Sequence, residues 1–513
     1  MTERLNVLFI LSDQHNAKVL SCKGHPDVRT PHLDALAESG VRFDNAITQN
    51  PICTPSRVSF LSGQYCHNHG YYGLSGPKPE GLPNMLGHFR RHGYATGAVG
   101  KIHCPEYWIE DDADCFHEVC GCSIGGRSKA YQDHLDRKGI DEDHEALVEL
   151  GNRQGRQKVD GRASLFSYDD SMEGWSVREG MRFMEASRDA GRPFMLHVSL
   201  PKPHQCYTPA QEFWDLYDFD SLTLPPNADY NMREAGKAPH LIAAADQWRT
   251  GDWTVFEPRT FEAGRLRKLR GYLGSVSQVD HAVGELMSFL DEAGLAENTI
   301  VVYSADHGDY ACEHGIMEKA PGICSDAITR IPMIWRVPGH TAAGTVCESL
   351  VEAVDVLPTL CSLAGLSELP TADGEDVSDL LRGQGEPVRE AAFTEFAWSK
   401  SVRKGPWRLV WYPRAFFAEE YPDGFGELYN IREDPWEMTN RWFDPACSEI
   451  VRDLERSLTD WLVTTARPTT ILTAARMKGD YVRRRYNNDV LTDGTVPPGY
   501  IGRRVRQNKK RYL

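Results

Sequence analysis

Apolar runs that end abruptly in polar residues constrain the fold of this chain most. The run NVLFILSDQ, residues 6–14, is continuous rather than alternating, which is typical of a strand buried on both faces of a sheet. Similar runs stand at residues 193–204, 298–310 and 330–339, and segments with helical spacing at 30–40, 82–92 and 265–295. This alternation predicts an α/β fold with a central mixed, mostly parallel sheet flanked by helices.

Polar residues follow several of these predicted strands directly. In open α/β sheets, binding sites form at the carboxyl ends of the strands. We therefore expect one sheet edge to gather Asp13, Lys101, His204, Asp306 and His307.

The pattern of predicted strands and helices changes beyond about residue 366. A loop-rich bridge is followed by short strand-like segments at 404–413 and 426–440 and by a helical segment at 447–465. We predict a catalytic α/β domain over residues 1–370 and a smaller C-terminal α+β domain with an antiparallel sheet over 371–475. Residues 476–513 form a basic, tyrosine-rich tail, which we expect to pack across a subunit boundary of a homo-oligomer.

Composition limits the partners. The chain has 513 residues and a net charge of -16, so nucleic acid is not an expected partner. No apolar run is long enough for a signal peptide or a membrane span, which predicts a cytoplasmic protein without a membrane partner. The 13 cysteines are then expected to be mostly reduced thiols.

Two sets of side chains carry the chemistry. Asp13, Gln14, Asp306 and His307 combine carboxylate, amide and imidazole groups that suit a divalent cation. Each of them alone is as well explained as a turn or cap residue. The second set is cationic or titratable and suits binding and protonation of an oxyanion ester; it comprises Arg57, Lys101, His103, His204 and Lys319.

Cys53 has sequence neighbours that are unusual for a structural cysteine. Cys53 lies in PICTPSRVSFLSGQ, in a proline-bounded turn beside Arg57 and just ahead of a predicted helix. A buried structural cysteine needs none of these neighbours, whereas a cysteine that does chemistry, or is converted into a group that does, can use them.

These segments resemble the sulfatase family. CTPSR with SFLSGQY resembles the family signature, whose cysteine is oxidised after translation to formylglycine. GYATGAVGKIHC, TIVVYSADHGDYACEHGIMEKA and ELYNIREDPWEMTN resemble further family segments in the same order. The resemblance implies an alkaline-phosphatase-like fold and a hydrolase that cleaves a small-molecule sulfate ester through a covalent sulfo-enzyme.

The resemblance also implies a role for each matching residue. Cys53, modified by a formylglycine-generating enzyme, would be the nucleophile, and as a hydrated aldehyde it would release sulfate by re-forming its carbonyl. Arg57 would orient the diol, Lys101 and Lys319 would bind anionic oxygens, His204 would protonate the leaving oxygen, and His103 would take the second diol proton. One divalent cation would be held by Asp13, Gln14, Cys53, Asp306 and His307.

Departures from the family pattern leave alternatives open. Most sulfatases have a second aspartate and an asparagine where Gln14 and His307 stand. The pattern here is similar to bacterial choline sulfatases and phosphonate monoester hydrolases, which makes manganese, or zinc, an alternative to calcium. Hydrolysis of a phosphonate monoester or phosphodiester is therefore the alternative activity. A non-catalytic binding protein on this fold is the alternative from a different functional class.

A cysteine-rich segment offers one further alternative. A structural zinc module is conceivable in the segment around residues 104–122, although the spacing fits no common zinc ribbon. Its candidate ligands are Cys104, Cys115, His117, Cys120 and Cys122.

Overall fold

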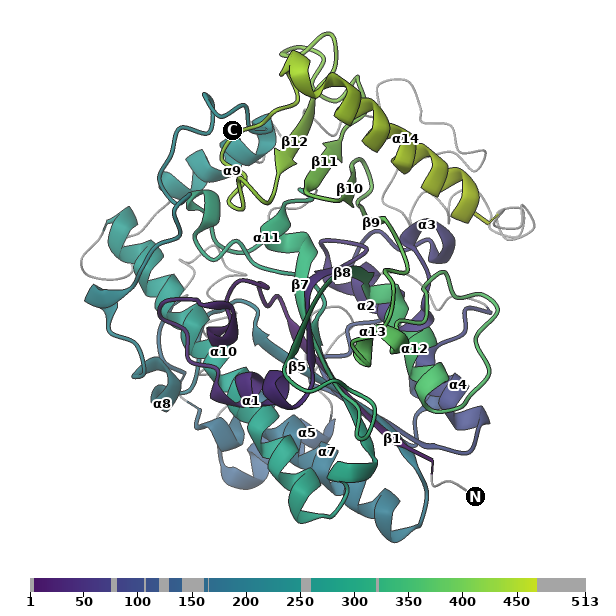
Figure 1. Cartoon of the computed structure of the whole chain (residues 1–513). Helices are drawn as coiled ribbons and strands as arrows, with labels where there is room; N and C mark the ends of the chain where they lie inside the picture. The colour runs from purple at the N-terminus through teal and green to yellow at the C-terminus, as the bar shows by residue number, and fades with distance from the viewer. Residues whose placement is uncertain are drawn as a thin grey trace, which may run out of the picture.

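A central sheet of eight strands organises the computed structural model, which describes residues 4–74, 81–105, 108–119, 129–140, 161–164, 166–250, 260–319 and 323–467 (Figure 1). The strand order is β4-β3-β5-β1-β6-β7-β2-β8. The strands are β1 (Asn6–Asp13), β2 (Val41–Ile47), β3 (Ala95–Gly100), β4 (Cys115–Glu118), β5 (Phe194–Pro203), β6 (Thr299–Ala305), β7 (Arg330–Arg336) and β8 (Thr345–Glu352).

The sheet is mixed but mostly parallel, as the sequence predicts. β1 pairs in parallel with β5 and β6, β3 with β4 and β5, and β2 with β8. Only β7 runs against its neighbours, since it pairs antiparallel with β6 and with β2. The carboxyl ends of the other strands therefore meet at one edge.

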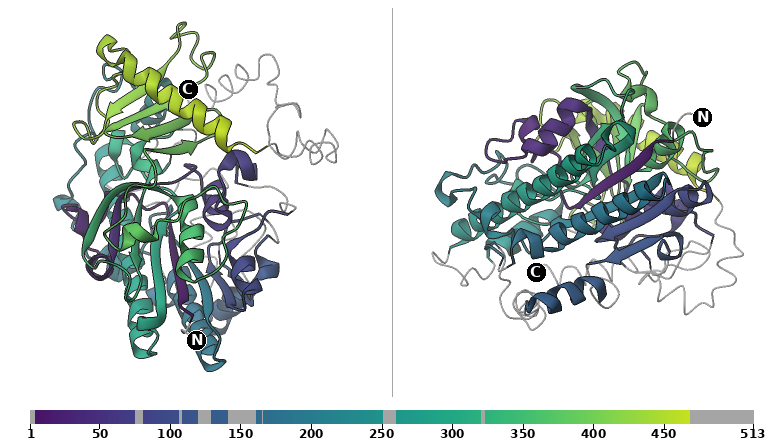
Figure 2. Two further views of the ribbon diagram at one scale, coloured as in Figure 1. Left: turned by 45° about the vertical axis from the view of Figure 1, so that its right-hand side comes forward. Right: turned by 90° about the horizontal axis from the view of Figure 1, so that it is seen from below.

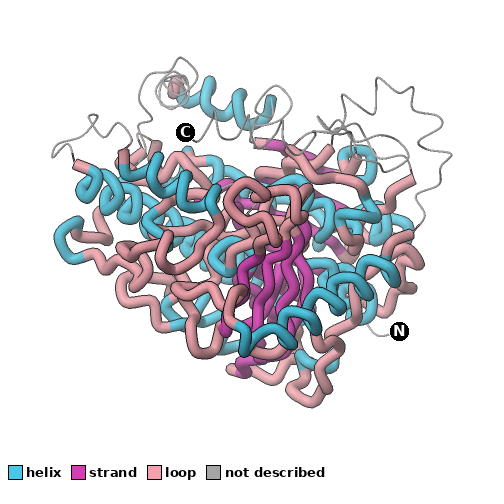
Figure 3. The backbone as a smooth tube through the Cα atoms, turned by 90° about the horizontal axis from the view of Figure 1, so that it is seen from above, coloured by secondary structure: helices cyan, strands magenta, loops and turns pink. Residues whose placement is uncertain are grey.

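Helices cover both faces of the sheet, which explains the continuous apolar strand sequences. Along β1, Leu8 and Ile10 belong to the core under α1 (Pro31–Ser39), α7 (Met172–Asp189) and α10 (Phe261–Glu292). Val7, Phe9 and Leu11 belong to the core under α2 (Cys53–Ser62), α4 (Met85–Arg91) and α12 (Val356–Leu363). The view from below shows α7 and α10 running side by side (Figure 2), and the view from above shows the strands between helices (Figure 3).

A second sheet follows towards the C-terminus. It is antiparallel, in the order β12-β11-β10-β9, and comprises β9 (Ala391–Glu395), β10 (Lys400–Lys404), β11 (Trp407–Trp411) and β12 (Gly426–Asn430). The amphipathic helix α14 (Ser448–Thr465) packs Leu454, Leu458 and Trp461 against it. The predicted smaller antiparallel layer is thus confirmed, whereas the domain limits at residues 370 and 475 stay predictions.

The remaining helices are short connections, apart from α5 and α9. They are α3 (Cys66–His69), α5 (Lys129–Lys138), α8 (Gln211–Trp214), α9 (Pro239–Arg249), α11 (Asp326–Thr329) and α13 (Ser378–Leu381). Within the described ranges, none of the helices combines the length and apolar character that crossing a membrane requires. The predicted basic tail, residues 476–513, lies outside the described part of the chain.

Candidate active site

Two neighbouring strands bring the first two acidic residues together. Asp13 is the last residue of β1, and Asp306 follows the last residue of β6. Ser12 and Ala305 are partners across these strands, and the Asp306 N–H donates to the Ser12 carbonyl at 3.2 Å. Both carboxylates are fully buried at the carboxyl edge of the sheet.

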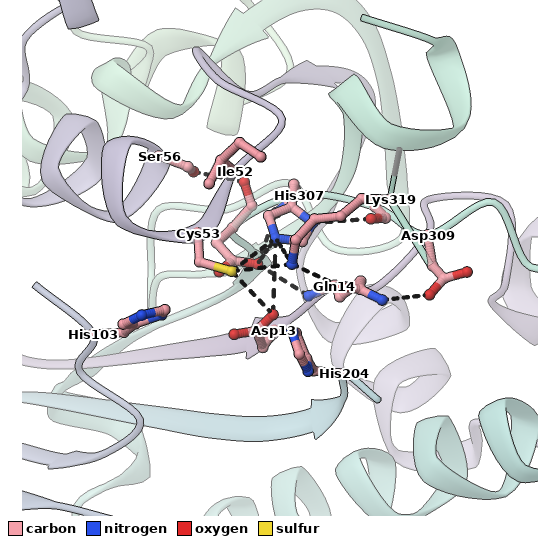
Figure 4. A network of polar contacts seen from close by, with 12 residues as sticks. Asp13, Gln14, Ile52, Cys53, Ser56, His103, His204, His307, Asp309 and Lys319 are labelled. Carbon is pink, nitrogen blue, oxygen red and sulfur yellow. Dashed lines mark hydrogen bonds and ion pairs between the residues drawn. The ribbon is translucent and has the colours of Figure 1, made fainter. Parts of the chain in front are cut away.

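Helix α2 carries Cys53 to the same edge. The helix begins at Cys53 itself, rather than after the expected turn. Two hydroxyls before and inside the helix, on Thr48 and Ser56, donate to the Asp306 carbonyl at 2.8 and 2.6 Å. The helix is thereby tied to the end of β6, and the Cys53 Sγ lies 3.2 Å from His307 Nε2 and 3.8 Å from Asp13 Oδ1 (Figure 4).

These residues fit a divalent cation. One ligand atom each of Asp13, Cys53, Asp306 and His307 lies within 4.8 Å of the others, and all four residues are buried. His307 Nδ1 donates to the Gly308 carbonyl at 2.9 Å, which leaves Nε2 as the coordinating nitrogen. Two carboxylates with an imidazole suit manganese or another transition metal as well as calcium.

Buried cations surround the carboxylates. The Arg57 guanidinium pairs through Nε with Asp306 Oδ2 at 2.9 Å and through Nη2 with Asp13 Oδ2 at 3.0 Å. Lys101 Nζ lies 2.5 Å from the same Asp13 oxygen. Burial and Cys53 act to raise the pKa of Asp13, but Lys101, His204 and Arg57 outweigh them and hold that pKa below its ordinary value.

Lys319 approaches Cys53 from the other side. Its Nζ lies 3.2 Å from Cys53 Sγ, 3.1 Å from His307 Nε2 and 2.8 Å from Gln14 Oε1 (Figure 4). Burial alone would raise the pKa of the Cys53 thiol, but Lys319, Lys101 and His307 lower it well below its ordinary value. The centre of the site is therefore built to stabilise negative charge on residue 53 and on groups bound to it.

Two histidines with unused nitrogens flank this centre. Both ring nitrogens of His103 are buried and have no hydrogen-bond partner among the described residues. Burial lowers the pKa of His103, and the adjacent Cys53 opposes that shift. His204, which follows β5, donates from Nδ1 to the Gln205 carbonyl at 2.6 Å, so Nε2 is the nitrogen left for proton exchange.

Gln14 lies in the site, and it leads to a residue that the sequence does not single out. Its backbone has a positive φ of 70°, and its N–H donates to Asp306 Oδ1 at 3.0 Å. Its side-chain Nε2 donates to the buried carboxylate of Asp309 at 2.6 Å. The signal for Asp309 was its place in the polar cluster YSADHGDY, two residues after His307.

The cysteine-rich segment of the alternative zinc module is described only in part. Cys120 and Cys122 lie outside the described residues. Cys104 is buried and Cys115 partly so, and both are free thiols. Across the described ranges, metal-ligand spacing is found only in the group around Cys53.

The fold is an alkaline-phosphatase-like α/β fold, and its sheet edge gathers buried acidic and cationic side chains around Cys53. The sulfatase family model matches residues 5–366, and the model of the N-sulphoglucosamine sulphohydrolase C-terminal region matches residues 312–463. The chain therefore belongs to the sulfatase family and is a hydrolase that acts on sulfuric esters.

Known relatives agree with this assignment. The ulvan-active sulfatase of Formosa agariphila is 27% identical over 465 residues, covering 88% of this chain and 80% of that protein. The choline-sulfatase of Rhizobium meliloti is 28% identical over 453 residues, covering 86% and 82%. A solved phosphonate monoester hydrolase from Silicibacter pomeroyi superposes with a TM-score of 0.74 at 23% identity, covering 90% of this chain and 96% of that one, which shows a shared fold.

Proposed function

We propose that this protein hydrolyses a sulfate monoester through a formylglycine that is formed from Cys53 by a converting enzyme. The observation that carries the proposal is the position of Cys53. Its Sγ lies among Asp13, His307 and Lys319 at 3.2–3.8 Å, in the first turn of the helix that holds the CTPSR sequence.

The chemistry follows from the hydrated aldehyde at position 53. One diol hydroxyl attacks the sulfur and gives up its proton, the S–O bond to the alcohol breaks as the alcohol oxygen takes up a proton, and the sulfuryl group is left on residue 53 as a covalent sulfo-enzyme. The second hydroxyl then loses its proton, the carbonyl re-forms, and sulfate departs. A divalent cation bound by Asp13, Asp306 and His307 would supply Lewis-acid stabilisation of the anionic oxygens.

The flanking side chains suit the remaining roles. Lys319 and Lys101 are placed to bind the oxygens of the transferred group. His204, whose Nε2 is available, would give a proton to the departing alcohol. The unpartnered His103 would accept the proton of the second hydroxyl. Arg57 would act on the diol through the two carboxylates that it holds.

A second candidate activity is hydrolysis of phosphonate monoesters or phosphodiesters by the same nucleophile. Gln14 and His307 favour it, because they stand where most sulfatases have an aspartate and an asparagine. The cation-rich centre around Cys53 would accept a tetrahedral oxyanion with either central atom.

A substrate panel with a modification assay tests the proposal. The protein is produced with and without a formylglycine-generating enzyme, and peptide mass spectrometry measures the converted fraction at residue 53. Initial rates are then compared for aryl sulfate, choline sulfate, sugar sulfates, a phosphodiester and a phosphonate monoester. We expect rates on sulfate esters to scale with conversion. Full activity in protein that carries only unmodified Cys53 would contradict the mechanism, and faster turnover of the phosphonate would favour the second candidate.

A further inference from the structure

The loop that follows β3, residues 101–103, carries His103 and is held from two sides. Glu118 is the last residue of β4, which pairs with β3 next to this loop. Its Oε2 accepts hydrogen bonds from the backbone N–H groups of Ile102 and His103, each at 3.0 Å. From helix α2, the Thr54 hydroxyl donates to the His103 carbonyl at 2.9 Å, and the Leu74 carbonyl shares the same proton at 3.1 Å. Both the N–H and the carbonyl of His103 are thus bonded to side chains of neighbouring elements.

The conformation of His103 depends on these contacts. Its φ is 48°, in the left-handed region, which is unfavourable for a residue that has a Cβ atom. Its imidazole is buried beside Cys53, and neither ring nitrogen has a hydrogen-bond partner in the part of the chain that the structure describes (Figure 4). The direction of the ring is therefore set by the backbone. Without the acceptor that holds it, the loop would be free to leave this conformation and to turn the ring away from position 53.

Lys101, at the start of the same loop, is held separately. Its N–H donates to the Ser199 carbonyl at 2.8 Å, and its Nζ pairs with Asp13 at 2.5 Å. Loss of the Glu118 acceptor therefore acts on His103 rather than on Lys101. The two residues serve different steps of the proposed function, because Lys101 binds the transferred group and His103 accepts a proton when sulfate is released.

We infer that Glu118 is a positioning residue, which holds the loop of residues 101–103 so that the His103 imidazole faces the reacting group at position 53. The inference rests on the proposed function. In its release step, the free hydroxyl of residue 53 gives its proton to His103, the C–O bond to sulfate breaks, and the carbonyl re-forms. Glu118 acts on this step through the backbone of His103, and what the backbone requires of it is an acceptor oxygen rather than a charge.

The substitution Glu118→Leu tests this directly, because it removes the acceptor and keeps a side chain of similar size. In a reaction with two chemical steps, kcat/KM reflects only the steps up to the sulfo-enzyme, whereas kcat also includes the release of sulfate. We expect kcat for an aryl sulfate to fall on the order of 10²-fold, as for a misplaced catalytic group. The value of kcat/KM should change by less than about threefold, so that KM falls together with kcat.

Pre-steady-state kinetics gives a second readout. When release of sulfate becomes the slow step, each converted active site should set free about one phenol in a rapid burst before the slow steady state. The measurements use the full-length enzyme with matched conversion of residue 53 and matched metal content. General damage to the site would lower kcat and kcat/KM together and would give no burst, so these readouts separate positioning from a merely structural role.

Two variants serve as controls. Glu118→Gln keeps an oxygen that can accept both N–H groups, so its kcat should stay within about threefold of that of the unsubstituted enzyme. Asp114→Leu removes a carboxylate that accepts from the Thr96 N–H at 3.2 Å, at the opposite end of the same strand pair. It should leave kcat and the burst unchanged, because the loop that carries His103 lies at the other end.

Combination with His103→Ala decides between the inference and the proposed function. In that background, Glu118→Leu should have no further effect on kcat, because the group that it positions is gone. Equal losses in both backgrounds would overturn the inference, as would a fall of kcat and kcat/KM together or a loss in Glu118→Gln as large as in Glu118→Leu. If Glu118→Leu does not fold, Glu118→Asp, which draws the carboxylate back by one methylene, is measured in the same way, and unchanged kinetics overturn the inference. Full kcat in converted His103→Ala enzyme would instead contradict the proposed function, because release of sulfate would not need that imidazole.

Discussion

Removal of the cation at Lys319 gives the sharpest test of how this site stabilises charge. Lys319→Met keeps much of the side-chain volume and removes only the ammonium, which lies 3.2 Å from Cys53 Sγ and 3.1 Å from His307 Nε2. The substituted enzyme retains Arg57 and Lys101 beside Asp13, so the metal-binding carboxylates keep their partners.

The size of the effect follows from these distances. Two unit charges 3.2 Å apart interact by about 5 kcal/mol at an effective dielectric constant of about 20. If about half a unit of charge develops beside Lys319 in the transition state, the loss is about 2.6 kcal/mol, or about 10²-fold in kcat. Removal of a single oxyanion-binding donor in other enzymes has an effect of about 10²–10³-fold, which agrees with this value.

The assay is steady-state hydrolysis of an aryl sulfate, with the formylglycine fraction and bound metal measured in every preparation. Lys23→Met is the control, because Lys23 pairs with Asp44 at 2.9 Å away from the site and is similarly shielded. We expect the control to retain its rate. A kcat for Lys319→Met within threefold of the unsubstituted enzyme, at equal conversion and metal content, would refute the placement of this cation at the reacting group.

Further predictions concern the nucleophile, the metal, a buried glutamate in β9 and the tail. Cys53→Ala should reduce turnover to near background while the protein still binds metal, as measured by elemental analysis. Asp306→Ala should lose both metal and turnover, and retention of stoichiometric metal would contradict its role as a ligand. Burial acts to raise the pKa of Glu395, but Lys400 outweighs it and lowers the pKa from 4.5 to about 2. A depressed pKa stabilises the fold above the unfolded value, so Glu395→Gln should lower the thermal midpoint at pH 7, by a difference that shrinks as pH falls from about 4.5 towards 2. Truncation after Ala475 should reduce the oligomer size seen by light scattering, and an unchanged mass would contradict the predicted subunit contact.

The strands most visible in the sequence are those buried on both faces. β1 and β6 are continuous apolar runs because helices cover both faces of the sheet. The sequence alone therefore predicts where these strands end, and with them the positions of Asp13 and Asp306. β8 (Thr345–Glu352) was not predicted, because it lies at the sheet edge and six of its side chains are only partly buried or exposed. Its sequence, TVCESLVE, accordingly lacks a long apolar run.

The direction of a strand in the sheet is harder to predict than the presence of the strand. The run at 330–339 predicts a strand, and β7 (Arg330–Arg336) confirms it, but nothing in its residues shows that it runs antiparallel to β6. The segment between them contains the Asp306–Lys319 part of the site and, among its described residues, only short helices, so these form no long crossover helix over a face of the sheet.

Partner-dependent roles could not be predicted at all. In the sequence, Asp309 is one more polar residue of a turn, and its Oδ1 does accept the local N–H of Ala311. Its other oxygen meets Gln14, which is 295 positions away in the chain. The residue type shows that Asp309 can accept hydrogen bonds, but only the fold determines which side chain donates to it.

The charges of the site also bear on the proposed conversion of Cys53. Asp13 and Asp306 are buried beside each other, and the guanidinium of Arg57 lies between them and pairs with both, which offsets the cost of burying them. Lys319 adds a cation that faces residue 53 itself. In unmodified protein burial acts to raise the pKa of the Cys53 thiol, but Lys319, Lys101 and His307 lower it well below its ordinary value. The proposed conversion to formylglycine would put an uncharged hydrated aldehyde at position 53 and leave the cations in place. The proposed nucleophile would then lie among cations without a charge of its own to offset them, which favours binding of an anionic ester.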